Sequence, residues 1–187
     1  MNRAEHLFSQ LKSTVRQGWV QHGIIQPESV AEHSWGTALL CLCYAASAGV
    51  DAFRAASMAI AHDLAESVTG DIPWSADADR REKHGIERRA AESVVGDLSV
   101  FGVEATDLLE LSLEYMEASS AEALFVRDMN LLDMVIQARR YEAVGSGRDL
   151  ADFYRNSEAR LNTTFGKALF RRFFGSVPED NGDETCC

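Results

Sequence analysis

The chain has 187 residues, the size of one ordinary domain with one hydrophobic core. Its hydrophobic content of 46% is typical of a globular protein, and its longest apolar stretch, residues 37 to 46, is far shorter than the ~20 residues of a membrane-spanning helix. The net charge of −11 argues against a broad nucleic-acid surface, because duplex phosphates require a basic face. We therefore expect no membrane and no large nucleic acid as partner, and a small phosphate-bearing ligand if there is one.

The composition of the two ends of the chain predicts where the protein is found and which segment is disordered. The amino terminus lacks the apolar segment of a secretory signal, so we expect a cytoplasmic protein. Residues 177 to 187 are acidic and are predicted to form a disordered tail after a folded domain over residues 1 to 176. The final pair, Cys186 and Cys187, is interpreted as reduced and exposed. The residues before it are acidic, whereas a prenylation signal usually follows basic residues.

Apolar residues recur at spacings of three and four, and only three prolines interrupt them, which predicts an all-α fold. A first helix is expected over residues 3 to 16, then a loop at Gly18 and Gly23. Residues 29 to 32 match the capping-box pattern and predict a helix to about residue 48. Further helices are predicted over residues 51 to 68, 78 to 98 and 104 to 117. A second capping box at residues 119 to 122 predicts a helix to about residue 144. Residues 149 to 174 are predicted to form one helix or a pair.

Cys41 and Cys43 fall inside the second predicted helix. Two residues apart on a helix, their side chains point to nearly opposite sides, so they cannot form half of a zinc site. We expect both to be packing residues.

Histidine and acidic residues occur at spacings that suit a divalent metal ion. His62 is followed directly by Asp63, and Glu66 lies within one helical turn of both, so the three side chains can share one face. His33 lies in the first turns of an earlier helix. Such ligands suit manganese, iron, cobalt, nickel or zinc, and the spacing does not distinguish these or magnesium. The pattern predicts metal-assisted hydrolysis with Glu66 near a water, and the alternative is that His62 is an ordinary core histidine.

A series of segments in fixed order resembles the HD-domain phosphohydrolases, and within them the group of HD-domain-containing protein 2 and the 5'-deoxynucleotidases. The segments are VRQGW at 15–19, PESVAEH at 27–33, HDLAE at 62–66, GDIP at 70–73, EKH at 82–84 and the stretch 119–142. The similarity extends over most of residues 10 to 170. It implies a single HD domain, an all-α helical bundle that holds one divalent ion.

The resemblance also implies which residues hold that ion. Three of the ligands would be His33, His62 and Asp63, and the fourth, an aspartate in the family, falls on Asn130. An asparagine oxygen can coordinate a metal but is neutral, so we expect a lower metal affinity. Asp133, about 60° from Asn130 around a helix, is the second candidate for this position. The third is Asp128, which is about 200° away.

Family nucleotidases convert (deoxy)nucleoside 5'-monophosphates to nucleoside and phosphate, and their metal ion lowers the pKa of the attacking water. By resemblance, Glu66 would position or deprotonate that water, and Arg16 would pair with phosphate oxygens. Trp19 would wall the sugar and disfavour ribonucleotides, while Asp71 would contact the 3'-hydroxyl. The alternatives are a surface ion pair for Arg16, a core aromatic for Trp19 and a loop or helix cap for Asp71.

Three functional hypotheses follow. The first is a metal-dependent 5'-nucleotidase, and the second is a catalytically weakened HD protein that binds a nucleotide or a protein partner, motivated by Asn130. The third is another HD chemistry, such as a diiron oxygenase or a pyrophosphohydrolase, for which five histidines offer few further ligands. We expect His84 to line or support the site, His6 and His22 to be surface residues, and, by analogy with the family, a homodimer.

Overall fold

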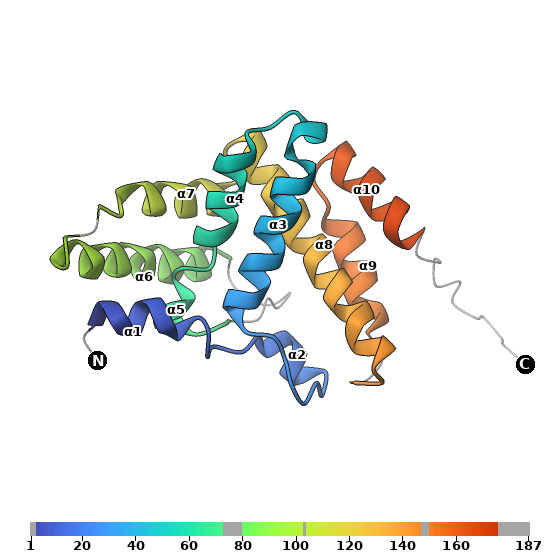
Figure 1. Cartoon of the computed structure of the whole chain (residues 1–187), viewed down its shortest axis with the longest axis horizontal. Coiled ribbons are helices and arrows are strands. Elements are labelled where there is room, and N and C mark those ends of the chain that lie inside the picture. The colour runs from blue at the N-terminus through green and yellow to red at the C-terminus, as the bar shows by residue number, and fades with distance from the viewer. Residues whose placement is uncertain (1–2, 73–79, 103, 147–149, 176–187) are drawn as a thin grey trace, which may run out of the picture.

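The computed structural model describes residues 3–72, 80–102, 104–146 and 150–175, and all regular secondary structure within them is helical, which confirms the predicted all-α class. Figure 1 shows the arrangement of the helices. They are α1 (Arg3–Gln10), α2 (Gln17–Gln21), α3 (Val30–Ala48), α4 (Ala52–Ala61), α5 (Glu66–Thr69), α6 (Arg80–Val100), α7 (Thr106–Glu117), α8 (Ala121–Ala143), α9 (Ala151–Arg160) and α10 (Thr164–Phe174). The predicted tail, with Cys186 and Cys187, lies outside the described residues.

Capping side chains fix where the long central helices begin. The Ser29 hydroxyl accepts from the Glu32 backbone N–H at 3.2 Å, and the Glu32 carboxylate accepts from the Ser29 N–H at 2.7 Å, so the predicted capping box is confirmed. The second predicted box is shifted, because Ser120, not Ser119, caps α8 and accepts from the Ala123 N–H. Since α3 and α8 start at these caps, the register of His33 and Asn130 is set locally.

Two predicted helix ends were wrong, and a helix forms in one predicted loop. The first helix ends at Gln10, and the short α2 forms where a loop was predicted. The third predicted helix ends at Ala61, because residues 62–65 form a tighter turn before α5. In this turn the hydrogen bonds span three residues in place of four, from Leu64 N–H to Ala61 O and from Glu66 N–H to Asp63 O. The final helical segment is a pair, α9 and α10. The turn at residues 62–65 is where the His-Asp pair lies.

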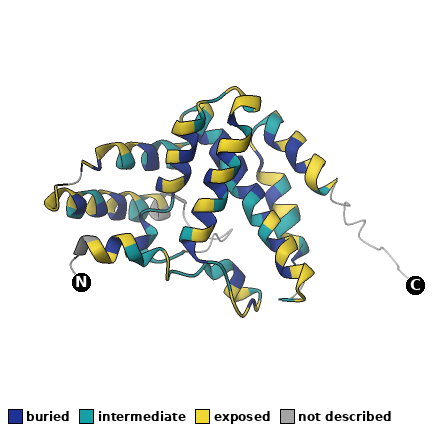
Figure 2. Ribbon diagram, in the orientation of Figure 1, coloured by how far each residue is buried: buried dark blue, intermediate teal, exposed yellow. Residues whose placement is uncertain are grey.

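The core lies where α3, α4 and α8 pack together. Small residues make this approach close: α4 buries Ala55, Ala56 and Ala59 against its neighbours, and helix separation depends on the side chains at the contact. Figure 2 shows the buried faces of these helices turned toward one another. Helices α1, α5, α6 and α7 form a second group beside this core (Figure 1).

The two cysteines of α3 differ in environment. Cys41 is fully buried, and burial raises the pKa of its thiol to about 12, so its packing role is confirmed. Cys43 is exposed, so the prediction that it packs was wrong. None of the helices in the described residues combines the length and apolar character needed to cross a bilayer.

Candidate active site

His33 on α3 and His62 at the end of α4 bring their rings together, with centroids 5.6 Å apart. His62 Nδ1 lies 2.7 Å from the Ala59 carbonyl oxygen, which can only accept, so this nitrogen carries the proton. His33 Nδ1 lies 2.7 Å from Asp133 Oδ2 and donates to it in the same way. With Nδ1 protonated, each ring in its neutral form keeps the lone pair on Nε2, the arrangement of metal-binding histidines oriented from behind.

The donor set around these nitrogens fits a divalent ion. His33, His62 and Asp63 each offer a ligand atom, and these atoms all lie within 4.8 Å of one another. His33 is fully buried, and its Nε2 has no hydrogen-bond partner. A buried polar atom without a partner costs about 1 to 3 kcal/mol, a cost that a coordinated cation would remove. Two imidazoles and a carboxylate suit a first-row transition metal.

The protonation states match this use. Burial, together with the nearby Arg16, lowers the pKa of His33 to about 3, so the ring is neutral at physiological pH. Burial alone would raise the pKa of Asp63, but His62 and Arg16 hold it below its usual value. Asp63 Oδ2 lies 3.0 Å from His62 Nε2. The site thus presents a neutral His33 imidazole beside an ionised Asp63 carboxylate, the forms that bind metal.

Asn130 on α8 lies beside this group. Its Nδ2 lies 3.3 Å from His62 Nε2 and donates to the Tyr115 hydroxyl at 2.6 Å. An amide nitrogen cannot bind a cation, but a half-turn of the amide exchanges nitrogen and oxygen at nearly the same place. Burial raises the pKa of Tyr115, so its hydroxyl remains protonated and can donate to the oxygen in the turned state. Position 130 is therefore adjacent to the ligand cluster, as the resemblance implied.

Asp133, the second candidate for the fourth ligand, lies behind His33 and does not line the cavity. Burial raises the pKa of its carboxyl to about 7. A methyl group at Gly36 would lie 2.1 Å from Asp133 Oδ1, so the glycine makes room for the carboxylate. Glu28 also lies near His33 and Asp133, but Trp19 Nε1 donates to it at 2.9 Å. The contacts of Asp133 are those of a residue that orients a metal ligand.

Asp128, the third candidate, lies away from the histidines. It is fully buried and accepts from the backbone and side-chain nitrogens of Asn162 at 2.6 and 3.0 Å and from the backbone nitrogen and hydroxyl of Thr163 at 2.8 and 2.6 Å. A methyl group at Gly166 would lie 2.2 Å from Asp128 Oδ2. Asp128 thus anchors the corner between α9 and α10, as its place on the far side of α8 from Asn130 required.

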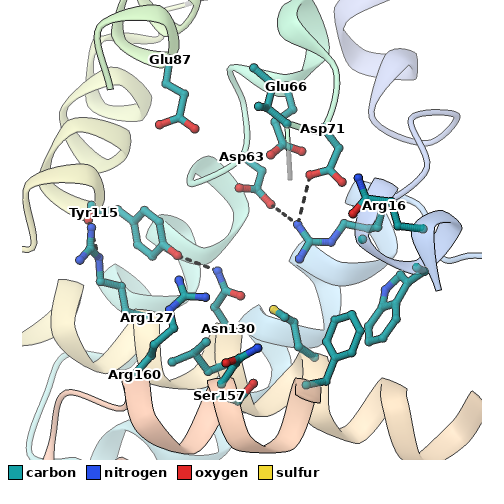
Figure 3. Close-up of a pocket in the computed structure, with 18 of the residues that line it drawn as sticks. Arg16, Asp63, Glu66, Asp71, Glu87, Tyr115, Arg127, Asn130, Ser157 and Arg160 are labelled. Carbon is teal, nitrogen blue, oxygen red and sulfur yellow. Dashed lines mark hydrogen bonds and ion pairs between the residues drawn. The ribbon is translucent and has the colours of Figure 1, made fainter. Parts of the chain in front are cut away.

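Asp63 and Asn130 line a cavity of about 670 Å³, within the range of small-molecule sites. Figure 3 shows Asp63, Glu66 and Asp71 on one side and Asn130 and Tyr115 on another, with their polar ends toward the open space. Arg16, just before α2, extends its Nη1 to 3.6 Å from Asp63 Oδ2 and 3.7 Å from Asp71 Oδ1. Burial would lower the pKa of Arg16, but these two carboxylates raise it, so the guanidinium is charged.

Trp19 lies at the edge of this cavity but is almost entirely buried, with 1% of its surface exposed. Its ring stacks on Phe153 at a centroid distance of 4.3 Å and meets Tyr141 edge-on at 5.2 Å. It is therefore both a core aromatic and part of the cavity wall. His84 lines the cavity, as predicted, and so does His22, which is half-buried and was predicted to be a plain surface residue.

Several lining residues had no signal in the sequence. Tyr115, Arg127 and Arg160 come from α7, α8 and α9, and their spacing matches no motif. Asp71 was predicted, and the Gln17 backbone N–H donates to its carboxylate, which ties the loop after α5 to the start of α2.

A model of the HD domain family matches residues 8–169 of the chain. The chain belongs to this HD domain family. It is 38% identical over 150 residues to the 5'-deoxynucleotidase hdd1 of Schizosaccharomyces pombe, covering 78% of this chain and 75% of that protein. It is 33% identical over 162 residues to the 5'-deoxynucleotidase HDDC2 of Homo sapiens, covering 83% and 76%.

A solved structure is also similar to this chain. The PH0347 protein of Pyrococcus horikoshii OT3 superposes with a TM-score of 0.74 at 33% identity, covering 95% of this chain and all of that one. The family resemblance and the helical-bundle fold predicted from the sequence are thereby confirmed.

Proposed function

We propose that this HD-domain protein is a metal-dependent phosphomonoesterase that converts deoxynucleoside 5'-monophosphates to nucleoside and phosphate. The observation that carries the proposal is the convergence of His33, His62 and Asp63, of which Asp63 lines a cavity that also contains Arg16. The relatives named 5'-deoxynucleotidases support the nucleotide as substrate class. A homodimer and a cytoplasmic location stay predictions.

His33, His62 and Asp63 would hold one divalent ion, with the Asn130 oxygen as the fourth protein ligand. Such an ion supplies a Lewis acid for the phosphoryl group and lowers the pKa of a water. Asp133 and the Ala59 carbonyl keep the two imidazoles in the tautomer that leaves Nε2 free. The protein's own contribution is therefore preorganisation of both rings before any ligand arrives.

Glu66 and Arg16 would act on the two partners of the reaction. The Glu66 carboxylate lines the cavity close to Asp63 and would take a proton from the attacking water. Arg16 carries a charged planar guanidinium beside the same space and would bind phosphate oxygens as negative charge moves onto the leaving group.

Trp19 and Asp71 would define the sugar side of the cavity. The Trp19 ring is fixed by stacking on Phe153, so it can form a rigid wall that crowds the 2' position. Asp71 is held by Arg16 and by the Gln17 N–H, and one of its oxygens would accept from the 3'-hydroxyl. These roles extend to this chain what the family resemblance implies for the matching residues.

The test is phosphate release from deoxy- and ribonucleoside 5'-monophosphates with manganese, cobalt, magnesium or zinc. We expect turnover by the wild type, none above background by His62→Ala, and unchanged turnover by Arg172→Gln, an exposed residue of α10. A wild type and an Asn130→Asp variant that are both inert with every ion, although folded, would contradict the proposal.

One observation favours a second candidate function, a binding protein of this fold with little turnover. Asn130 brings no charge to the ligand cluster, and its amide nitrogen lies 3.3 Å from His62 Nε2. A protein of this kind would bind a nucleoside monophosphate in calorimetry and release no phosphate, and Asn130→Asp would gain activity.

A further inference from the structure

We propose that Arg160 is a second phosphate-binding side chain of this site, across the cavity from Arg16, and that Asp128 positions it. This inference rests on the proposed function and deepens it. Arg160 is the last residue of α9, far in sequence from the proposed metal ligands, and lines the same cavity as Arg16, Asp63 and Asn130. Figure 3 shows its side chain extending from α9 into the cavity toward Tyr115 and Asn130, while Arg16 enters from the opposite side.

The charge of the cavity calls for a second cation. Arg16 is already flanked by two carboxylates at 3.6 and 3.7 Å, and Glu66, Glu87 and Asp152 line the same space. A phosphomonoester brings nearly two negative charges at neutral pH, because its second pKa lies near 6. An anion entering a cavity with this many carboxylates needs positive charge besides Arg16. The wall formed by α8 and α9 supplies it.

Arg127 adds charge to the same wall without itself needing to reach the ligand. Its Nε and Nη2 donate to the carbonyl oxygens of Tyr115 and Met116, at 3.1 and 2.8 Å, and its guanidinium lies 5.4 Å from the centre of the Tyr115 ring. These partners are neutral, so the charge of Arg127 is fixed in place but not cancelled by them. The positive potential on this side of the cavity therefore has two sources.

Asp128 fixes the chain immediately after Arg160. Its carboxylate accepts four hydrogen bonds from Asn162 and Thr163. The Thr163 hydroxyl in turn accepts from the Gly166 N–H at 2.8 Å and caps α10. A buried carboxylate that accepts several N–H and O–H groups is a strong local anchor. Because α9 ends at this corner, the origin of the Arg160 side chain is set by Asp128.

Two guanidinium groups on opposite sides of a metal-binding cluster favour one class of substrate. A phosphomonoester has three non-bridging oxygens, so one can face the cation site while Arg16 and Arg160 each bind another. A phosphodiester has only two and would leave one guanidinium without an oxygen. The arrangement thus selects terminal phosphates, and Arg160 would contribute to substrate binding and not to proton transfer.

The test measures binding of inorganic phosphate by calorimetry to the manganese-loaded wild type, Arg160→Gln, Arg160→Lys and the charge-matched control Arg172→Gln. Because Arg160→Gln removes a charged hydrogen-bonding group, we expect its phosphate affinity to fall about tenfold or more. Arg160→Lys should recover part of this affinity, and the control should show no change. With a nucleotide substrate, KM rises more than kcat falls. Equal metal content and circular dichroism across the variants exclude misfolding.

Asp128→Asn tests the positioning role separately. It is expected to weaken phosphate binding in the same direction as Arg160→Gln, and to add little to the effect in the double variant. A lower melting temperature with unchanged phosphate affinity would show that Asp128 is only structural and would overturn its positioning role.

The possible failures are distinguishable. If the wild type hydrolyses nucleotides and Arg160→Gln matches Arg172→Gln in phosphate affinity and KM, the Arg160 inference is wrong and the proposed function stands. If the wild type turns over no monophosphate but loses phosphate affinity on Arg160→Gln, the phosphate-binding role holds and the nucleotidase proposal fails.

Discussion

Asp128 and Asp133 lie on the same helix, α8, and each turns a carboxylate toward a glycine of a neighbouring helix, Gly166 of α10 and Gly36 of α3. Asp133 accepts a hydrogen bond from His33 Nδ1 and so orients a proposed metal ligand. Asp128 receives four hydrogen bonds at the corner that follows Arg160. One helix therefore supports two groups of side chains. We call the proposed ligands His33, His62 and Asp63 the metal-binding wall. The opposite wall carries the cationic side chains of Arg127 and Arg160.

The difference between the walls lies in how their side chains are held. On the metal-binding wall each imidazole has a hydrogen bond behind it, so its free nitrogen has one direction. On the opposite wall the buried Asp128 carboxylate fixes the backbone after Arg160, and so the point from which the Arg160 side chain extends. Ring placement by a hydrogen bond suits coordination geometry, whereas a planar guanidinium on a long side chain suits a phosphate that enters and leaves.

The largest expected effect comes from removing a ligand of the metal-binding wall. His62→Ala should lower the rate of phosphate release by about a thousandfold or more, because metal catalysis supplies several kcal/mol and each 1.4 kcal/mol is a factor of ten. Arg160→Gln should cost far less in kcat. Steady-state kinetics of the two variants under saturating manganese gives the comparison, and equal losses in kcat would show that the two walls do not divide the work in this way.

Substituting the two aspartates should separate their roles. Asp133→Asn keeps the shape but weakens the support of His33, and loss of such an outer partner typically lowers metal affinity 10- to 100-fold. Asp128→Asn should leave the manganese affinity within about twofold and lower the thermal midpoint instead, since it weakens the α9–α10 corner. Calorimetric titration with manganese and thermal unfolding measure these two quantities. Loss of manganese binding by Asp128→Asn would contradict the separate roles of the two aspartates.

The metal-binding wall was predictable because its residues belong to contiguous segments. His62 and Asp63 are adjacent, Glu66 follows within a turn, and His33 lies just inside a capping box, so local rules place them. The corner between Asp128 and Asn162 was not predictable, because it joins helices through contacts between residues distant in sequence. Asp128 was the third candidate for the fourth metal ligand. Only the packing of α8 against α9 and α10 shows that its carboxylate binds the corner between those two helices.

Helix boundaries failed for a related reason. The apolar pattern of α4 continues past Ala61, so the sequence predicted a helix to residue 68, but the chain turns at residues 62–65. The capping residue Ser29, which acts within one turn, was predicted correctly. Local hydrogen bonds are visible in a sequence, whereas a change of direction imposed by tertiary contacts is not.

Adding a methyl group at the two glycines should disturb each wall separately. Gly36→Ala and Gly166→Ala would bring the new carbon to 2.1 and 2.2 Å from carboxylate oxygens. Overpacking of this kind costs about 1 to 3 kcal/mol in the free energy of unfolding. Gly96→Ala on α6 is the matched control, because nothing lies within 4 Å of the added carbon, and helix propensity predicts a gain of up to about 1 kcal/mol.

Chemical denaturation of the three glycine variants measures these changes. Gly36→Ala should in addition lose manganese affinity, and Gly166→Ala should lose phosphate affinity. Similar ligand affinities in both variants would contradict the separate support of the two walls.

The smallest expected effect concerns the neutral ligand. Asn130→Asp adds a negative charge beside His62 and should raise manganese affinity by about tenfold, a typical value for one added charge at a partly buried site. Tyr115→Phe removes the hydroxyl that lies 2.6 Å from the amide and should lower the affinity slightly. Titration calorimetry resolves both changes, and a fall in affinity for Asn130→Asp would place the fourth ligand elsewhere.

The most direct measurement is the metal content of the purified protein after chelation, reloading with manganese and gel filtration. The wild type and Arg160→Gln should each retain one ion per chain, whereas His62→Ala should retain none, and activity should follow the bound ion. Retention of an ion by His62→Ala equal to that of the wild type, or failure of the folded wild type to bind any divalent ion, would contradict a metal centre built on His33, His62 and Asp63.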